Sequence, residues 1–234
     1  MGTGTAAQLA AAGVGPGDEV IVPSFVTTAE AAEAVRRTGA IPVFVDIDPV
    51  SLCIDPAAVA DAVTRRTAAV VAAELFGHSA DLTALQVIAA DNALALVTTT
   101  DPPLAHAPSS CEIARRQAGA AYLGARLTGV VTPSVAPGAV HEYHAYVVRV
   151  PGNGRPDRDA FARALRARGV RCRVPVPTPV HRLPLFRAEL WLPETERAAG
   201  ECLALPLEGR MSRRELQRIV SAANALGGLL PAAA

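Results

Sequence analysis

The sequence of 234 residues contains no lysine, so all of its 22 basic residues are arginine. Arginine keeps its proton at any working pH and therefore cannot act as an amine nucleophile. Because a Schiff base on a protein side chain requires a lysine amine, this absence excludes that covalent chemistry from the side chains of this chain.

Net charge and long apolar runs are also missing. The 22 arginines are balanced by 22 acidic residues, so no overall field would draw the chain to nucleic acid or to an anionic membrane, and we expect neither as a partner. No apolar run approaches the roughly 18 residues that span a bilayer. The first residues lack the basic and apolar regions of a signal peptide, so a cytoplasmic protein is expected.

Metal and disulfide patterns are missing as well. The four cysteines lie far apart without a CxxC pair, so neither a metal site nor a disulfide framework is expected. The one close pair of histidines is His141 and His144. On the strand that we predict for this segment they point to opposite faces, so we expect no shared metal.

The first half of the chain alternates between two kinds of pattern. Short apolar runs typical of buried strands occur within residues 18–22, after the acidic pair Asp18-Glu19, and at 41–45, 68–73 and 94–97. Between them lie stretches of helix formers, and two of these open with a capping signal, Asp55-Pro56 and Asp81. This alternation predicts an α/β fold with a parallel, doubly wound sheet.

A change of composition divides the chain. Residues 98–110 hold three prolines and a polar cluster and predict a loop. The remainder reads as an α+β unit. It has predicted helices at 111–127, 157–168, 193–203 and 212–226, the last opened by a capping box at Ser212 and Glu215, and predicted strands at 141–150 and 170–176. We expect two domains, 1–117 and 118–234.

Seven segments together resemble the nucleotide-sugar aminotransferase family, the DegT/StrS group. They are GTAA at 4–7, GVGPGDEVIVPSF at 13–25, PVFVDID at 42–48, LFGHSAD at 75–81, HEYHAYVVRV at 141–150, PVHR at 179–182 and LALPL at 203–207. Each match alone is weak, but they occur in the family's order over nearly the whole chain. The resemblance implies a fold-type-I scaffold, the cofactor pyridoxal phosphate, dimers, and nucleotide-linked keto-sugars as substrates.

The resemblance also shows what this chain lacks. The family's acid that holds the pyridine nitrogen falls at Thr99, and a hydroxyl cannot keep a pyridinium charged as a carboxylate does. The ring-stacking aromatic is replaced within Val26-Thr27-Thr28. After Ser109-Ser110 the segment that carries two strands and the Schiff-base lysine is missing, as are the family's arm and first strand upstream of Gly4. The expected fold is therefore a shortened fold-type-I large domain, mostly parallel sheet, with a small α+β domain.

Few site residues remain as candidates. By the resemblance, Gly4 and Thr5 are a remnant of the loop that binds the cofactor phosphate, with a frayed terminus as the alternative. His181 and Arg182 match a substrate element and would contact a nucleotide-sugar diphosphate, with a solvated loop as the alternative. Asp101 and His106 are a candidate acid–base pair, with a solvated loop as the favoured alternative. The arginines 163, 166, 168, 171 and 173 are a candidate diphosphate site, with a solvated helix face as the favoured alternative.

These observations predict a degenerate aminotransferase homologue that does not transaminate alone. It would serve as an accessory subunit or in cofactor-free chemistry in sugar or natural-product biosynthesis, without a bound cofactor when isolated. Two alternatives stay open: an active enzyme completed in trans by a partner that supplies the lysine, and a gene remnant without function. Because the deletion removes the neighbours of strand 94–97, we expect an open sheet edge. A second copy, an intact aminotransferase or the folded-back linker 98–110 would cover this edge, and a homodimer is favoured.

Overall fold

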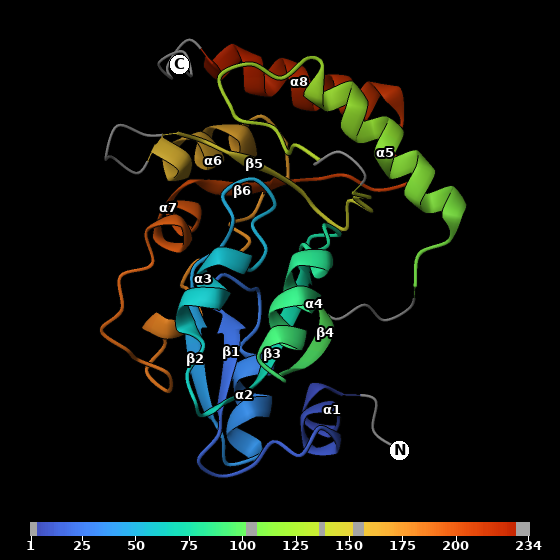
Figure 1. The fold of residues 1–234 in the computed structure, drawn as a ribbon. Helices are drawn as coiled ribbons and strands as arrows, with labels where there is room; N and C mark the ends of the chain where they lie inside the picture. The colour runs from blue at the N-terminus through green and yellow to red at the C-terminus, as the bar shows by residue number, and fades with distance from the viewer. Residues whose placement is uncertain (1–3, 102–106, 136–138, 152–156, 228–234) are drawn as a thin grey trace. The chain divides into compact units, whose positions relative to one another are not determined.

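The computed structural model describes residues 4–101, 107–135, 139–151 and 157–227 (Figure 1). The chain divides into two compact units. The first contains residues 1–75, 79–104 and 178–196, and the second contains 76–78, 105–177 and 197–234. These units differ from the expected domains 1–117 and 118–234, because residues 178–196 add Val180, Phe186 and Leu192 to the core of the first unit.

The first unit is built on a parallel sheet of four strands. The strands are β1 (Glu19–Pro23), β2 (Ile41–Val45), β3 (Thr67–Leu75) and β4 (Ala95–Asp101), in the order β2-β1-β3-β4. The sheet confirms the α/β fold with parallel strands. Every residue of β1 is buried, as the apolar run Val20 to Val22 predicts for a central strand, and the buried Glu19 at its start pairs with Arg66.

Four helices connect or flank these strands: α1 (Thr5–Ala11), α2 (Glu30–Arg37), α3 (Pro56–Ala62) and α4 (Leu82–Asp91) (Figure 1). Helix α1 packs against α2, and α3 packs against α4. The two capping signals are confirmed, since Asp55 accepts a hydrogen bond from the Ala57 N–H and Asp81 accepts one from the Ala84 N–H.

The order of the strands defines where a ligand site is expected in the first unit. The chain leaves β1 for β2 on one side and then crosses back past β1 to β3. The connections therefore diverge between β1 and β3, and ligands of such sheets bind beyond the carboxyl ends of the strands at this point. Ser24 follows β1 there, and Asp101 ends β4 at the same edge of the sheet.

The second unit joins an antiparallel pair of strands to several helices. Its elements are α5 (Ser110–Gly124), β5 (Tyr146–Arg149), α6 (Asp157–Ala167), β6 (Cys202–Leu205) and α8 (Arg213–Gly227). Helix α8 packs against α5 and α6 (Figure 1). Leu123, Tyr146, Leu165 and Leu203 are fully buried in its core. The capping box at Ser212 is confirmed, because Ser212 and Glu215 exchange hydrogen bonds.

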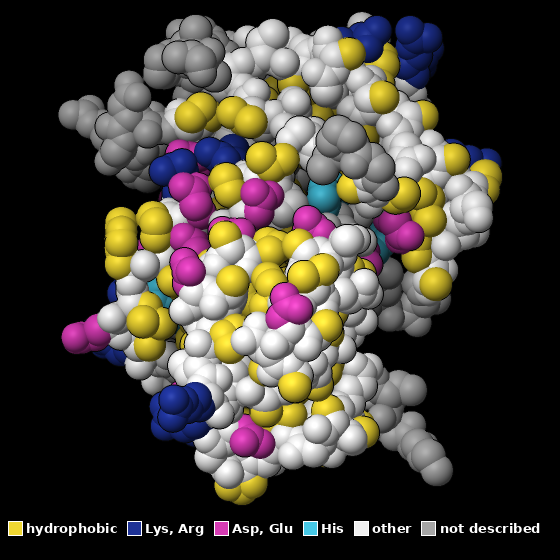
Figure 2. Space-filling model, in the orientation of Figure 1, with side chains coloured by type: hydrophobic (Ala, Val, Ile, Leu, Met, Phe, Trp, Pro, Cys, Tyr) yellow, Lys and Arg dark blue, Asp and Glu magenta, His cyan; other side chains and the backbone are white. Residues whose placement is uncertain are grey.

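Two segments remain. A short 3-10 helix, η1 (Val180–Arg182), belongs to the first unit, and α7 (Pro193–Glu201) begins in the first unit and ends in the second. Within the described ranges, no helix combines the length and the apolar character needed to cross a bilayer. The face drawn in Figure 2 carries arginine and acidic side chains in separate small groups among hydrophobic ones.

Four predictions of local structure were wrong. The loop predicted from Thr98 begins too early, because Thr98 to Asp101 pair with β3 and β-branched threonine suits a strand. The strand predicted at 141–150 is reduced to Tyr146–Arg149, since Tyr143 has a φ of 49° and breaks the extended backbone. Of the predicted strand 170–176, Arg173 alone bridges to β6. Cys202 to Leu205, expected partly as helix, are the buried strand β6.

Candidate functional site

Asp101 lies at the carboxyl end of β4 and is occupied by hydrogen bonds from the loop after β1. Its carboxylate accepts bonds from the Thr27 N–H, the Thr27 hydroxyl at 2.9 Å and the Thr28 hydroxyl at 3.2 Å. Asp101 is only 5% exposed, and this burial raises the pKa of its carboxyl although the three bonds oppose the shift. The carboxylate of Asp101 therefore holds the loop after β1 and does not face a ligand.

The cavity beside Asp101 is very small. Its volume is about 20 Å³, and it is lined by Thr5, Val26, Thr28, Glu30, Ala31, Ala73, Thr99, Thr100 and Asp101. A cavity needs roughly 10–15 Å³, measured in this way, to hold one water molecule. The space therefore holds about one water and no organic cofactor.

Gly4 and Thr5 lie at the start of α1. Gly4 is the N-cap residue with an extended backbone and no capping side chain, and Thr5 is buried and lines the small cavity. The N–H groups of a first helical turn can bind an anion, but α1 has only seven residues. The expected phosphate contact of Gly4 and Thr5 stays a prediction.

His181 is fully buried, and both of its ring nitrogens are hydrogen-bonded. Nδ1 lies 2.6 Å from the hydroxyl of Ser24, and Nε2 lies 3.1 Å from Oε1 of Glu196. The Ser24 oxygen also accepts a bond from the backbone N–H of His181 at 3.0 Å. Ser24 therefore donates to Nδ1, and Nε2–H donates to Glu196. Burial lowers the pKa of the imidazole, which favours this neutral form.

This arrangement anchors residues 178–196 to the sheet. Arg182 donates from Nε to Oε1 of Glu196 at 2.7 Å and is partly exposed. At the start of α7, the carboxylate of Asp46 accepts bonds from the N–H groups of Glu194 and Thr195 at 2.9 and 2.7 Å. With no ring nitrogen at the surface, His181 needs a movement of η1 to reach a ligand, and the substrate contacts of His181 and Arg182 stay a prediction.

The other candidate residues are dispersed. His106, the expected partner of Asp101, lies outside the described residues. Two arginines of the suggested diphosphate cluster bind nearby backbone carbonyls: Arg166 donates to the Cys172 carbonyl and Arg168 to the Ala164 carbonyl. Such bonds support the solvated-face interpretation of this cluster.

The second unit holds an aromatic group that sequence reasoning missed. The rings of His141 and Tyr143 stack at 3.9 Å, and Tyr146 lies 6.1 Å from Tyr143 between ring centroids. His141 accepts a bond from the Tyr143 N–H at Nδ1, and burial lowers the pKa of its imidazole to about 3. Gly77, at a φ of 88°, permits this packing, because a Cβ there would lie 2.8 Å from the Tyr143 nitrogen.

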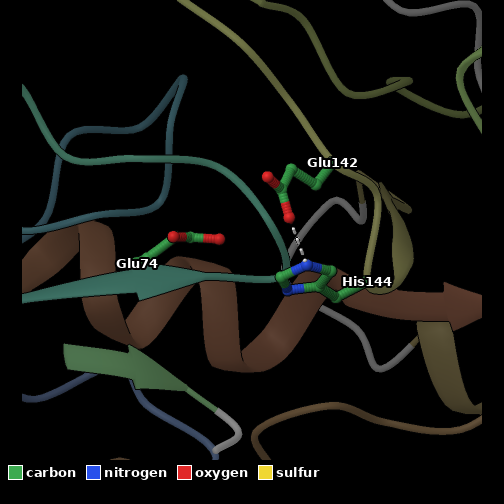
Figure 3. Close-up of side chains that lie close together, drawn as sticks. All are labelled: Glu74, Glu142 and His144. Atoms are coloured by element: carbon green, nitrogen blue, oxygen red, sulfur yellow. Dashed lines mark hydrogen bonds and ion pairs between the residues drawn. The ribbon is translucent and has the colours of Figure 1, made fainter. Parts of the chain in front are cut away.

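His144 and Glu142 form a pair on the irregular segment before β5. Nε2 of His144 lies 2.9 Å from Oε2 of Glu142, and Figure 3 shows the two side chains pointing toward one another. Glu74, also labelled in Figure 3, belongs to β3 of the first unit. His141 and His144 therefore have different surroundings, since His141 belongs to the aromatic group.

The strand order and the polar groups beyond the strand ends define a fold-type-I aminotransferase scaffold. The solved structure of S. venezuelae DesV in complex with a ketimine intermediate is similar with a TM-score of 0.84 and 25% identity, covering 95% of this chain and 82% of that one. The structure of 3-amino-5-hydroxybenzoic acid synthase, 22% identical, shares the fold with a TM-score of 0.81, over 96% of this chain and 85% of that chain.

The chain belongs to the DegT/DnrJ/EryC1/StrS aminotransferase family, whose model matches residues 2–107 and 104–224. The erythromycin biosynthesis sensory transduction protein EryC1 of Saccharopolyspora erythraea is 30% identical over 301 residues, covering 92% of this chain and 80% of that protein. The L-glutamine:2-deoxy-scyllo-inosose aminotransferase of Micromonospora echinospora is 49% identical over 89 residues, or 38% of this chain and 21% of that protein.

The same comparisons locate the shortening of the chain. The match to EryC1 extends over 301 residues, more than the 234 of this chain, so the relative carries internal residues that have no counterpart here. The two matched pieces of the family model meet at residues 104–107. This position agrees with the deletion expected after residue 110.

The residues present do not fit pyridoxal phosphate. No lysine exists to hold it as a Schiff base. By the family resemblance, Thr99 falls at the position of the acid for the pyridine nitrogen, and Asp101 is bonded to Thr27 and Thr28. The cavity beside Asp101 has room for about one water. A second cavity of about 200 Å³, lined by Thr98, Thr99 and Thr100, has no basic side chain among its described lining residues. Sequence reasoning identified the absence of lysine and predicted the loss of the acid. The small cavity beside Asp101 and the Ser24–His181–Glu196 contacts join residues too distant in sequence to be predicted.

Proposed function

We propose that this chain is a degenerate homologue of sugar aminotransferases that does not transaminate alone and acts as an accessory subunit of an intact relative. One observation carries the proposal: the chain contains no lysine, and the carboxylate of Asp101 at the end of β4 is already bonded to Thr27 and Thr28. Transamination requires an amine to anchor the cofactor and an acid to keep its pyridine nitrogen charged. Neither group is available in the first unit.

The edge of the sheet supports an assembly. β4 pairs with β3 and, within the described residues, has no strand on its other side. The seven residues of β4 contain no proline, and an unprotected edge strand offers unpaired N–H and C=O groups to a second chain. A homodimer is favoured, because members of this family dimerise through the large domain, and a heteromer with an intact aminotransferase comes next.

The names of the relatives suggest the kind of biosynthesis in which this chain acts. EryC1 is named for erythromycin biosynthesis, and the Micromonospora relative is named for amination of 2-deoxy-scyllo-inosose. We place this chain in the biosynthesis of an amino sugar or a related natural product. A nucleotide sugar is its proposed ligand, with the forked donor of Arg182 for the diphosphate.

Light scattering and co-purification test the assembly. The chain alone and the chain with a full-length family member from the same genome are compared for mass and for amine transfer from L-glutamine. We expect no transfer by the chain alone, no monomer at micromolar concentration, and a several-fold change in the activity of the full-length member when the two are mixed.

A variant of the edge strand is the control. Thr98→Glu places a charge on an exposed residue of β4 and should dissociate the assembly, whereas Thr83→Glu on α4 should not. A stable wild-type monomer without effect on the full-length member contradicts the accessory role and favours cofactor-free chemistry or a gene remnant. Transfer that appears only in the mixture, at sites formed by both chains, favours completion in trans.

A further inference from the structure

The second unit contains a cavity of about 410 Å³ beside β5. One wall is a face of α5 composed of small side chains, and the rest comes from the segment before β5. The described lining residues are Gln117, Ala120, Ala121, Gly124, Ala125, Pro133, Val135, Ala139, Val140, His141, Tyr143 and Tyr146. The α5 residues recur every three or four positions, so they share one side of the helix.

An aromatic wall closes one side of this cavity. The His141 ring stacks on Tyr143 with an angle of 9° between the planes, and Tyr146 lies beside Tyr143 at an angle of 28°. Opposite, alanine and glycine on α5 leave space that larger side chains would fill. Apolar concave surfaces with aromatic walls and few polar groups are typical of small-molecule sites, whose volumes run from about 300 to 1,000 Å³.

The hydroxyl of Tyr146 is the unsatisfied polar group of this cavity. Tyr146 is 1% exposed, and its Oη has no hydrogen-bond partner among the described residues. A Cβ on Gly124 would lie 3.6 Å from Oη, so the hydroxyl is directed toward the α5 wall. Burial raises the pKa of the phenol, which therefore keeps its proton and remains a donor. A buried donor without an acceptor is costly and calls for an explanation.

The charge of the lining restricts the ligand. None of the described lining residues is arginine, aspartate or glutamate. His141 is neutral, because burial depresses the pKa of its imidazole and Nδ1 already accepts the Tyr143 N–H. A phosphate, carboxylate or ammonium group would gain no counter-charge from these lining residues.

We propose that this cavity binds an uncharged ring compound that carries a carbonyl or ether oxygen. The ring contacts the aromatic wall. Once it has displaced the adjoining part of α5, the buried Oη of Tyr146 donates a hydrogen bond to the oxygen. A water molecule satisfies Tyr146 less well, because an ordered water needs two to four polar partners and the wall near Oη is alanine and glycine. This site is independent of the proposed loss of transamination.

Titration with prodan, an uncharged naphthalene that bears a ketone and a dimethylamino group, tests the site by fluorescence. Wild type should bind one molecule per chain. Tyr146→Phe removes only the hydroxyl and should weaken binding about five- to tenfold, the effect of one hydrogen bond. Ala121→Phe fills the cavity and should weaken binding by more than about twentyfold.

Two variants of α5 outside the lining are the matched controls: Tyr122→Phe removes a hydroxyl, and Ala118→Phe adds a ring, and both should bind prodan like wild type. Far-ultraviolet circular dichroism confirms that each variant folds. Absence of binding by wild type, or equal affinity of the Tyr146→Phe and Ala121→Phe variants and wild type, overturns the proposal.

Discussion

The two units differ in whether their buried polar side chains are hydrogen-bonded. Beyond the strand ends of the first unit, Asp101 and His181 are buried and hydrogen-bonded, and the cavity beside Asp101 is about 20 Å³. A second cavity of this unit, lined by Thr98, Thr99 and Thr100, is about 200 Å³. In the second unit, a cavity of about 410 Å³ remains and the Tyr146 hydroxyl has no partner among the described residues. Family motifs persist in both units, so motif similarity alone does not indicate which unit still offers a ligand site.

The largest expected effect is the loss of stability in a His181→Ala variant, which tests whether His181 is a structural residue of the core. His181→Ala removes the bonds to Ser24 and Glu196 and leaves a cavity, so the free energy of unfolding should fall by about 3 kcal/mol. Urea unfolding followed by the fluorescence of Trp191, the only tryptophan and part of the first unit, measures it. Arg182→Ala, at a partly exposed ion pair, should cost less than about 1 kcal/mol. Equal losses would contradict the structural role.

Acid should weaken the second unit through His141. The pKa of the folded imidazole is about 3, below the value of about 6.5 in the unfolded chain. The unfolded state therefore binds a proton first as the pH falls, and stability present above pH 6.5 is lost below it, by about 1.4 kcal/mol per unit. The loss reaches about 3 kcal/mol near pH 4.5.

The neighbours of His141 must be considered in that measurement. His78 and His144 face it and lower its pKa further, and the Tyr143 N–H binds its Nδ1. His141→Gln removes the titrating group while keeping an acceptor, so urea unfolding followed by circular dichroism should show a shallower dependence on pH. The same slope in wild type and variant would place the titration elsewhere.

A smaller effect on the free energy of unfolding is expected when the hydrogen-bonded carboxylate of Asp101 is changed. Asp101→Asn replaces an acceptor with an amide nitrogen that faces donors from Thr27, so the free energy of unfolding should fall by about 1–2 kcal/mol. Asp61→Asn on the exposed face of α3 is the control and should change it by less than about 0.5 kcal/mol. A neutral Asp101→Asn would mean that the loop after β1 does not depend on this carboxylate.

The smallest effect has the opposite sign. Tyr146→Phe removes a buried hydroxyl without a partner among the described residues, so it should leave stability unchanged or raise it by up to about 1 kcal/mol. Thermal unfolding without added ligand measures it, beside Tyr122→Phe. A clear loss of stability would mean that the Tyr146 hydroxyl has a hydrogen-bond partner. The two units would then not differ in how their buried polar groups are bonded.

Local sequence signals predicted much of the fold. The strands of the first unit follow from continuous apolar runs, and Asp55, Asp81 and Ser212 open helices as their capping patterns predict. Pairing between distant residues was beyond these signals. Cys202 to Leu205 become a strand because they pair with β5, more than 50 residues earlier, and Thr98 to Asp101 extend β4 because they pair with β3.

The candidate site shows the same limit. The zero count of lysine and the threonine at position 99 are visible in the sequence and predict the loss of the cofactor chemistry. The contact of Ser24 with His181 spans 157 residues, and no local pattern encodes it. The contact arises because residues 178–196 pack in the first unit, although the residues before and after them belong to the second. This packing buries His181.

The central claim is that this chain alone does not bind pyridoxal phosphate as a cofactor. The most direct test incubates the chain with pyridoxal phosphate and measures binding by dialysis. The sample is then reduced with borohydride, and its peptides are analysed by mass spectrometry. Without a lysine and with room for about one water beside Asp101, the chain should bind no stoichiometric cofactor, and every internal peptide should keep its unmodified mass. One equivalent of bound pyridoxal phosphate, or a reduced pyridoxyl group on any internal residue, would contradict the account.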